Sequence, residues 1–313
     1  MFRNIPFTLA LLLLYPAAAW ADSGMPLVPG QLWQAWNLDW LILFNLGLLG
    51  WIYARGLWRL WSKAGTGRAV GRAQAAAYFT SLLVIVSALI SPLDALSDEL
   101  ASAHMVQHML LMVVAAPLFV FGAPGFVLNW GLARRWRRTA GKWRQWLAVD
   151  ALNRPWLPWL LYAAVLWIWH LPSAYQAALF DPLVHDAQHL TFFVAACWFW
   201  QVLLHPLRRG VHPITAVILL FTTSLHATLL GVFMALSPAV WYDVYAPRTA
   251  AWGFTPLADQ QLAGLIMWMP ACLIYPAMAA ATLGRWLVTL SANEEEGRIS
   301  RHALAPGSRR TAS

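Results

Sequence analysis

The chain has 313 residues, of which 60% are hydrophobic and only 11% are charged. Soluble domains carry about 25% charged residues, so this composition excludes an ordinary soluble protein and indicates one that crosses a membrane several times. The 21 Lys and Arg residues outnumber the 13 Asp and Glu residues. In a soluble domain that excess would suggest a nucleic-acid partner. Here we expect membrane lipid around the chain, basic cytoplasmic loops and no nucleic acid.

The first 21 residues are typical of a secretory signal peptide. Arg3 supplies the positive start, residues 5–15 form a short apolar stretch, and Ala19-Trp20-Ala21 fits the small-x-small cleavage pattern. An uncleaved first helix is the alternative interpretation. In both cases residues 22–37 are expected on the outer side of the membrane.

Seven further apolar segments follow, each close to the ~20 residues that a helix needs to cross a bilayer. Turn signals such as Ser91-Pro92 and His205-Pro206 mark their ends. The segments cover residues 38–54, 75–91, 104–121, 155–171, 186–204, 214–236 and 261–283. We therefore predict an all-α, polytopic bundle of seven transmembrane helices within residues 22–290.

Basic residues fall almost entirely on one side of these segments. Nineteen of the 21 lie in the loops after the first, third and fifth segments or in the tail, and the exceptions are Arg3 and Arg248. Because basic loops stay in the cytoplasm, the predicted orientation has the N-terminus outside and the C-terminus inside. From Ser291 the polar, charged sequence predicts a disordered cytoplasmic tail over residues 291–313.

Two copies of the pattern H-x-x-Q-H introduce apolar segments. His104 and His108 begin the third segment, and His185 and His189 begin the fifth. In each copy the i, i+4 spacing places both imidazoles on one helix face, where they can bind one metal ion or line one polar pocket. The glutamines of the pattern, Gln107 and Gln188, point about a third of a turn away. They are expected either to hydrogen-bond an imidazole or to join helices.

The predicted orientation brings further polar residues to the same outer face. Ionisable side chains inside a bilayer are costly and usually line a site or a pathway, although a lone histidine often only hydrogen-bonds a neighbouring helix. Asp259 and Asp186 are expected to orient imidazoles through hydrogen bonds. The predicted metal ligands are His104, His108, His185 and His189, with His170, His226 or Met112 completing the set.

Nearby methionines favour copper among the metals that imidazole binds. Neutral imidazole suits Zn, Cu, Fe and Ni, whereas thioether ligands select Cu(I). Met105, Met109 and Met112 follow one another down the third segment, beside its histidine pair. Two alternatives remain open at this point. One is a haem b held by one histidine from each pair, and the other is a metal-free polar cluster that only packs helices.

Several uncommon strings occur in a fixed order between residues 39 and 283. They include Ser91-Pro92-Leu93-Asp94, Ser102-Ala103-His104-Met105-Val106-Gln107-His108, Trp169-His170-Leu171-Pro172, His185-Asp186-Ala187-Gln188-His189, Leu225-His226-Ala227, Trp241-Tyr242 and Asp259-Gln260-Gln261. In these strings the chain resembles the CtaG family of cytochrome c oxidase assembly factors.

The resemblance implies a multi-pass protein of the bacterial inner (plasma) membrane, with a periplasmic N-terminus, that is needed to make an active haem–copper oxidase. It implies an assembly factor rather than an enzyme. The expected partners are one or more cytochrome c oxidase subunits, with other copper chaperones as further candidates. The expected cofactor is copper, as Cu(I), held transiently at the periplasmic face for delivery to the oxidase.

Overall fold

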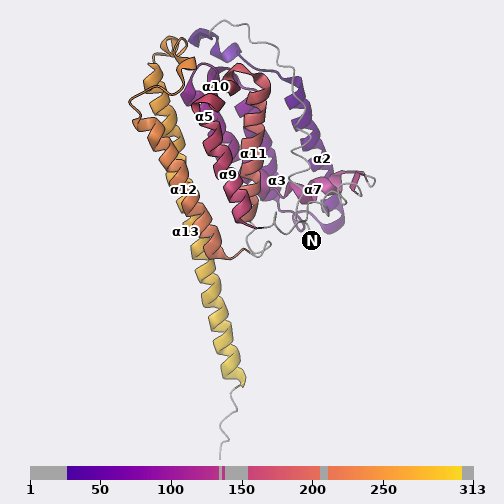
Figure 1. The fold of residues 1–313 in the computed structure, drawn as a ribbon. Coiled ribbons are helices and arrows are strands. Elements are labelled where there is room, and N and C mark those ends of the chain that lie inside the picture. Colours follow the sequence, from indigo (N-terminus) through magenta and orange to yellow (C-terminus); the bar gives the residue numbers. More distant parts are fainter. Residues whose placement is uncertain (1–26, 134–135, 138–153, 205–210, 305–313) are drawn as a thin grey trace, which may run out of the picture.

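A computed structural model shows a bundle of helices (Figure 1). It describes residues 27–133, 136–137, 154–204 and 211–304, so the predicted signal peptide lies outside the described residues. All regular elements within these ranges are helical, which confirms the all-α prediction there. The elements are η2 (Pro29–Gln34), α2 (Trp40–Ala64), α3 (Arg72–Leu89), α4 (Pro92–Ser97), α5 (Ala101–Met109), η3 (Leu110–Ala115), α6 (Ala116–Phe121), α7 (Pro124–Gly131), α9 (Trp156–Trp169), α10 (Pro172–Phe180), α11 (Pro182–Leu204), α12 (Pro213–Leu236), η6 (Asp243–Tyr245), η7 (Thr249–Trp252) and α13 (Pro256–Leu304).

The predicted multi-pass architecture is confirmed. Within the described residues six helices are long and apolar enough to cross a membrane, and α9 with α10 makes a seventh if this bent pair counts as one span. α9 has only 14 residues, and a bend of 74° separates it from α10. Pro172 begins α10 and has no N–H to continue the ladder of α9, so α9 ends close to the predicted end of the fourth segment at residue 171.

The centre of the bundle is formed by α11 and by the continuous span α5–η3–α6. In each of these two spans 61% of the most apolar stretch of residues is buried inside the protein, compared with 28% to 44% in the other spans. The central span packs against α3, α11 and α13. Side chains carried by α5 and α11 therefore lie inside the protein, whereas much of α2, α3 and α13 is available to lipid.

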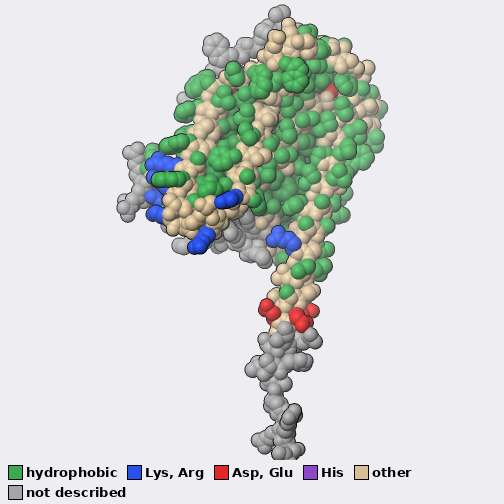
Figure 2. Space-filling model, turned by 180° about the vertical axis from the view of Figure 1, so that it is seen from behind, with side chains coloured by type: hydrophobic (Ala, Val, Ile, Leu, Met, Phe, Trp, Pro, Cys, Tyr) green, Lys and Arg blue, Asp and Glu red, His purple; other side chains and the backbone are tan. Residues whose placement is uncertain are grey.

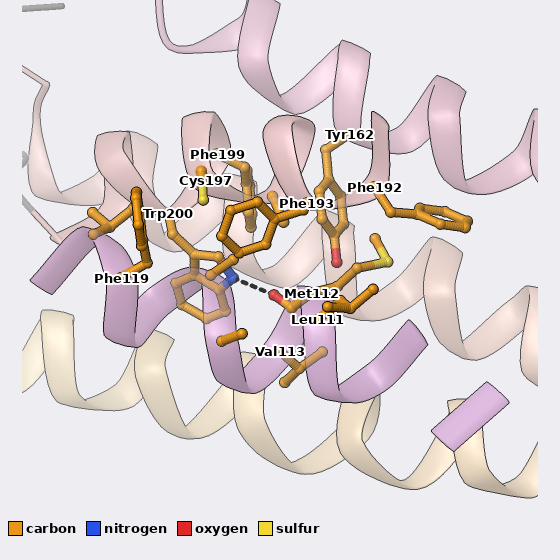
Figure 3. Packing of buried hydrophobic residues seen from close by; sticks show 14 of the residues in the cluster. Leu111, Met112, Val113, Phe119, Tyr162, Phe192, Phe193, Cys197, Phe199 and Trp200 are labelled. Atoms are coloured by element: carbon orange, nitrogen blue, oxygen red, sulfur yellow. Dashed lines mark hydrogen bonds between the residues drawn. The ribbon is translucent and has the colours of Figure 1, made fainter. Parts of the chain in front are cut away.

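The middle of the central span, η3, is a π-helix. The N–H of Ala116 donates to the carbonyl of Leu111, five residues earlier, and Pro117 has no N–H to offer. The carbonyl of Met112 is thereby left for another donor, and the indole Nε1–H of Trp200 on α11 donates to it at 2.9 Å (Figure 3). This bond ties the two central helices together.

Two glycines allow α12 and α13 to pack closely side by side (Figure 1). A Cβ added at Gly264 would lie 2.5 Å from the backbone nitrogen of Ala235, and one at Gly231 would lie 2.9 Å from the carbonyl oxygen of Gly264. Both separations are too short for any side chain, so the contact depends on glycine at these positions.

α13 continues as a helix to Leu304, well beyond the point where a disordered tail was predicted. It projects from the bundle in Figure 1. Residues 291–304 contain several strong helix formers, including Glu294, Glu295 and Glu296, and an existing helix can extend without the cost of a new nucleus. The prediction of disorder from Ser291 was therefore wrong as far as Leu304, and residues 305–313 lie outside the described residues.

We call the end of the bundle at which α5, α11 and α13 begin the histidine end. The short elements α4, α10, η6 and η7 also lie at this end (Figure 1). α2 ends and α3 begins at the opposite end, which places Lys63, Arg68 and Arg72 there. Lys and Arg side chains accordingly gather towards the end from which α13 projects (Figure 2).

Candidate metal centre

α5 carries the first histidine pair, and its N-terminus is fixed by Asp259 of α13. The Asp259 carboxylate accepts hydrogen bonds from the backbone N–H groups of Ala101 at 2.6 Å and of Ser102 at 3.2 Å. These N–H groups have no partner within the helix, and a carboxylate there also interacts favourably with the helix dipole. One turn into the helix, the ring centroids of His104 and His108 are 4.3 Å apart.

α11 carries the second pair and faces α5. Asp181 caps its first turn by accepting backbone hydrogen bonds at 2.8 and 3.4 Å. The ring centroids of His185 and His189 are 4.3 Å apart. Across the helix interface the His104 centroid lies 5.3 Å from that of His185, and the His108 centroid lies 5.4 Å from that of His189. The two H-x-x-Q-H copies therefore converge.

Three of these imidazoles are close enough together that they could hold one metal ion. One ligand nitrogen from each of His104, His108 and His189 can be chosen so that all lie within 4.8 Å of one another. With metal–nitrogen bonds of about 2.0 Å, nitrogens on one tetrahedral ion stand about 3.3 Å apart, so small ring movements would close the set around an ion. All three rings are buried, with exposures of 0%, 0% and 7%.

The nitrogens of these rings lack partners. Within the described chain, both nitrogens of His104 and of His108 and Nε2 of His189 are buried with no hydrogen bond. Each unsatisfied buried polar atom costs about 1–3 kcal/mol. Several together in one pocket are unusual for a packing cluster, and their lone pairs would be satisfied by a cation.

His170 completes a five-histidine cluster, which we define as His104, His108, His170, His185 and His189. It follows the last turn of α9, and its Nδ1–H donates to the carbonyl of Leu166 at 2.7 Å. Nε2 of His170 is buried and has no hydrogen-bond partner in the described part of the chain. A backbone carbonyl that accepts from one ring nitrogen in this way orients the other nitrogen towards a metal. Its ring centroid lies 6.3 Å from that of His108.

A set of three tyrosines covers the cluster, and sequence reasoning missed it. The Tyr175 ring packs on His104 at 5.0 Å and stacks on Tyr242 at 3.9 Å, and its hydroxyl lies 3.2 Å from that of Tyr245. The sequence feature that could have revealed this set is the close spacing of Tyr242 and Tyr245 in a loop between two apolar segments. We call these three residues the tyrosine cover.

Hydrogen bonds fasten the tyrosine cover to the rest of the histidine end. Tyr242 donates to the carbonyl of His170 at 2.9 Å, and Tyr245 donates to the carbonyl of Ser97 at 3.1 Å. Burial raises the pKa of Tyr242, and burial followed by the charge of Tyr175 raises that of Tyr245. Both hydroxyls therefore keep the protons that they donate.

Two predicted ligands are not among the five clustered histidines. The ring of His226 on α12 contacts Trp159 of α9 at 6.2 Å, and it is not one of the five clustered rings. Met112 is fully buried in the hydrophobic core, with Phe192 and Tyr162 in the same packed group (Figure 3).

The two glutamines of the motif differ in role. Gln107 Nε2 donates to the carbonyl of Ala88 at 2.8 Å and to the Asp94 carboxylate at 2.7 Å, so it joins α5 to α3 and α4. Gln188 instead lies close to His104. Both polar atoms of its amide are buried, and neither makes a hydrogen bond in the described chain.

The predicted acidic partners of the imidazoles bind elsewhere. Asp259 caps α5, as described above, and therefore positions the helix rather than a ring. Asp186 is exposed at the start of α11. Its charge acts on Asp94, whose pKa is raised to about 6, first by burial and then by Asp186 and Asp39.

The fold and the cluster define a class: a multi-pass membrane protein with a cluster of histidines, most of them buried, at one end of its helix bundle. Residues 51–289 match the family model described as cytochrome c oxidase caa3 assembly factor (Caa3_CtaG). The chain belongs to this family of cytochrome c oxidase assembly factors. The family resemblance drawn from its motifs is thereby confirmed.

A curated relative is similar over most of this chain. It is "Uncharacterized protein ML1998" of Mycobacterium leprae (strain TN), which is 25% identical over 276 residues, or 82% of this chain. The aligned part is 40% of that relative, so the chain spans about two fifths of its length. No solved structure matches the chain.

Proposed function

We propose that the protein is a non-catalytic assembly factor that binds Cu(I) transiently in the five-histidine cluster and passes it to a cytochrome c oxidase subunit in the membrane. The observation that carries this proposal is the convergence of His104, His108 and His189, with ligand nitrogens within 4.8 Å of one another. Family membership supports the oxidase as the partner.

The chemistry of the pocket supports copper. Unpartnered imidazole nitrogens suit a late first-row ion. The ligand groups within the cluster are all imidazoles, and the neighbouring rings are Tyr175 and Phe192, packed on His104 and His108 at 5.0 and 4.6 Å. Neutral imidazole ligands bring no negative charge to the ion, which favours a monovalent ion over a divalent one.

The distribution of charge supports a periplasmic location for the cluster. Basic side chains gather towards the end opposite to the histidine end (Figure 2), and basic loops remain cytoplasmic. The histidine end would then face the periplasm, with the N-terminus on that side and the C-terminal end of α13 in the cytoplasm.

The ring separations support a single ion over haem b. A haem needs a flat gap between its two axial imidazoles, whose centroids stand about 6 Å apart. The His104 and His189 centroids stand 5.9 Å apart, but the rings of His108 and His185 lie within 4.3 to 5.4 Å of both, so the space between that pair is not free for a porphyrin. A metal-free packing role would leave these buried imidazole nitrogens without a protein partner in the described chain.

Metal content and the visible spectrum of detergent-purified protein test the proposal. The wild type should contain copper after expression with added copper, and the double variant His108→Ala/His189→Ala should contain far less. His212→Asn, at the opposite end, is the matched control, because Asn keeps the side-chain acceptor that caps α12. Equal copper in the wild type and the double variant would contradict the metal site, and a strong Soret band would favour haem.

A further inference from the structure

The cluster holds more imidazoles than one ion can bind, and one of them differs in exposure. Cu(I) and Zn²⁺ sites in proteins use about three or four ligands, whereas five histidines gather here. Four of the five rings are buried, with exposures of 0% for His104 and His108, 3% for His170 and 7% for His189. His185 is only partly buried and lies on the first turns of α11.

Ring separations divide the cluster into two overlapping sets. Two imidazoles on one ion, with metal–nitrogen bonds of about 2 Å, have centroids no more than about 6 Å apart. His104, His108 and His189 meet this limit at 4.3, 5.4 and 5.9 Å, and we call them the inner set. His104, His185 and His189 also meet it, at 4.3, 5.3 and 5.9 Å, and form the outer set.

The two sets share an edge. His104 and His189 belong to both, so an ion could pass from one set to the other while these two imidazoles remain bound. Only the third ligand would change, from His185 in the outer set to His108 in the inner set. Nε2 of His185 is buried and without a hydrogen-bond partner in the described chain, so it is available for such a bond.

The surroundings of His185 favour the arrival of a cation. Asp181 and Asp186 are both exposed on the same end of α11. Asp94 lies close enough for the charge of Asp186 to raise its pKa, although burial is the larger cause. Carboxylates near a binding site raise the local concentration of positive ions and speed their association.

We propose that His185 is the ligand through which the copper ion enters and leaves the pocket. The ion binds first to the outer set and then moves inward, as the bond to His185 Nε2 breaks and a bond to a His108 nitrogen forms. Copper stays Cu(I), no electron or proton is transferred, and His104 and His189 remain bound throughout. Release is the reverse exchange. This inference rests on the proposed function, because it assumes Cu(I) in the cluster.

Rates and affinity separate this role from that of a permanent ligand. Purified protein is mixed with Cu(I) held by the chromophoric chelator bicinchoninate, and the loss and return of the chelator colour give loading, release and equilibrium affinity. For His185→Ala we expect loading and release both to slow about tenfold, the effect of about 1.4 kcal/mol in a transition state. The affinity should stay unchanged, because the inner set is intact.

Matched variants make the outcomes distinct. His108→Ala should weaken the affinity and speed release while loading stays as in the wild type, and His212→Asn should change nothing. His185→Gln, which keeps a polar side chain of similar length, serves if the alanine variant does not purify as a folded protein. Weaker affinity in the His185 variants, as large as in His108→Ala, would make His185 a permanent ligand and overturn the inference. Unchanged rates would overturn it as well. A wild type that takes no Cu(I) would instead contradict the proposed function.

Discussion

The Asp259 carboxylate accepts a hydrogen bond from the backbone N–H of Ala101 at 2.6 Å, although the two residues are 158 positions apart. A residue at the start of the last span thus caps the helix that carries His104 and His108. Gln260 and Gln261 bind the carbonyls of Ala239 and Ser237 in the preceding loop, so the start of α13 holds several parts of the histidine end together.

Removing this cap should loosen the site without removing a ligand. Asp259 is fully buried, and in Asp259→Ala the N–H groups of α5 lose a charged acceptor, which costs about 2 kcal/mol or more. We expect a lower unfolding temperature in detergent and a reduced copper content. Asp259→Asn keeps an acceptor oxygen and should fall between the wild type and Asp259→Ala. Wild-type copper content in Asp259→Ala would show that the position of α5 does not depend on the cap.

The bond between Trp200 and the carbonyl of Met112 should be worth about 1–3 kcal/mol, because Trp200→Phe leaves a buried carbonyl unpaired. Thermal unfolding in detergent measures the change, and Trp58→Phe is the control, since Trp58 is 69% exposed. Hydrogen exchange should also rise in residues 110–115. Equal losses of stability in the two variants would mean that the hydrogen bond contributes nothing specific.

The close packing of α12 and α13 predicts opposite effects for two glycines on the same helix. Gly264→Ala would force a methyl group to within 2.5 Å of the Ala235 backbone nitrogen, and we expect a loss of about 1–3 kcal/mol from overpacking. Gly284→Ala meets nothing within 4 Å and should be neutral or stabilising by up to about 1 kcal/mol through helix propensity. Unfolding temperatures of the two variants, compared in one detergent, check the contrast.

Asp94 should make stability depend on pH. Burial, and then the charges of Asp186 and Asp39, raise its pKa from 3.8 to about 6, against hydrogen bonds from Asn37 and Gln107 that lower it. The folded chain therefore binds this proton more tightly than the unfolded chain does. The free energy of unfolding should fall as pH rises through that interval, by at most about 3 kcal/mol. Unfolding temperatures across the interval should show this fall in the wild type and a flatter profile in Asp94→Asn.

Much of the fold followed from periodicity and charge alone, because lipid imposes strong limits on helix length and loop composition. The apolar segments predicted each span, and the i, i+4 spacing of His104 with His108 and of His185 with His189 predicted two paired ligand faces. Their convergence could be proposed because both pairs begin segments that run in the same direction.

Other features depended on contacts that no local pattern carries. Asp259 was expected to orient an imidazole, but its distance from α5 in the sequence hides that it caps that helix. Met112 was expected to complete the ligand set, and the sequence pattern did not reveal that its side chain is fully buried in the hydrophobic core. Tyr175 reaches His104 only because the chain turns by 74° after α9.

The π-helix has one more consequence. A wide turn of this kind accommodates one residue more than the α-helical path would need. Deleting a single residue from Leu110–Ala115 would let the span rewind as a regular helix, and the half that follows would turn by roughly 100° about its axis relative to the half that precedes it. Phe119 would then leave its place against Tyr78 and Phe193. The π-helix thus sets the rotation, about the helix axis, between the half of the span that carries the histidines and the half that packs against α3 and α11.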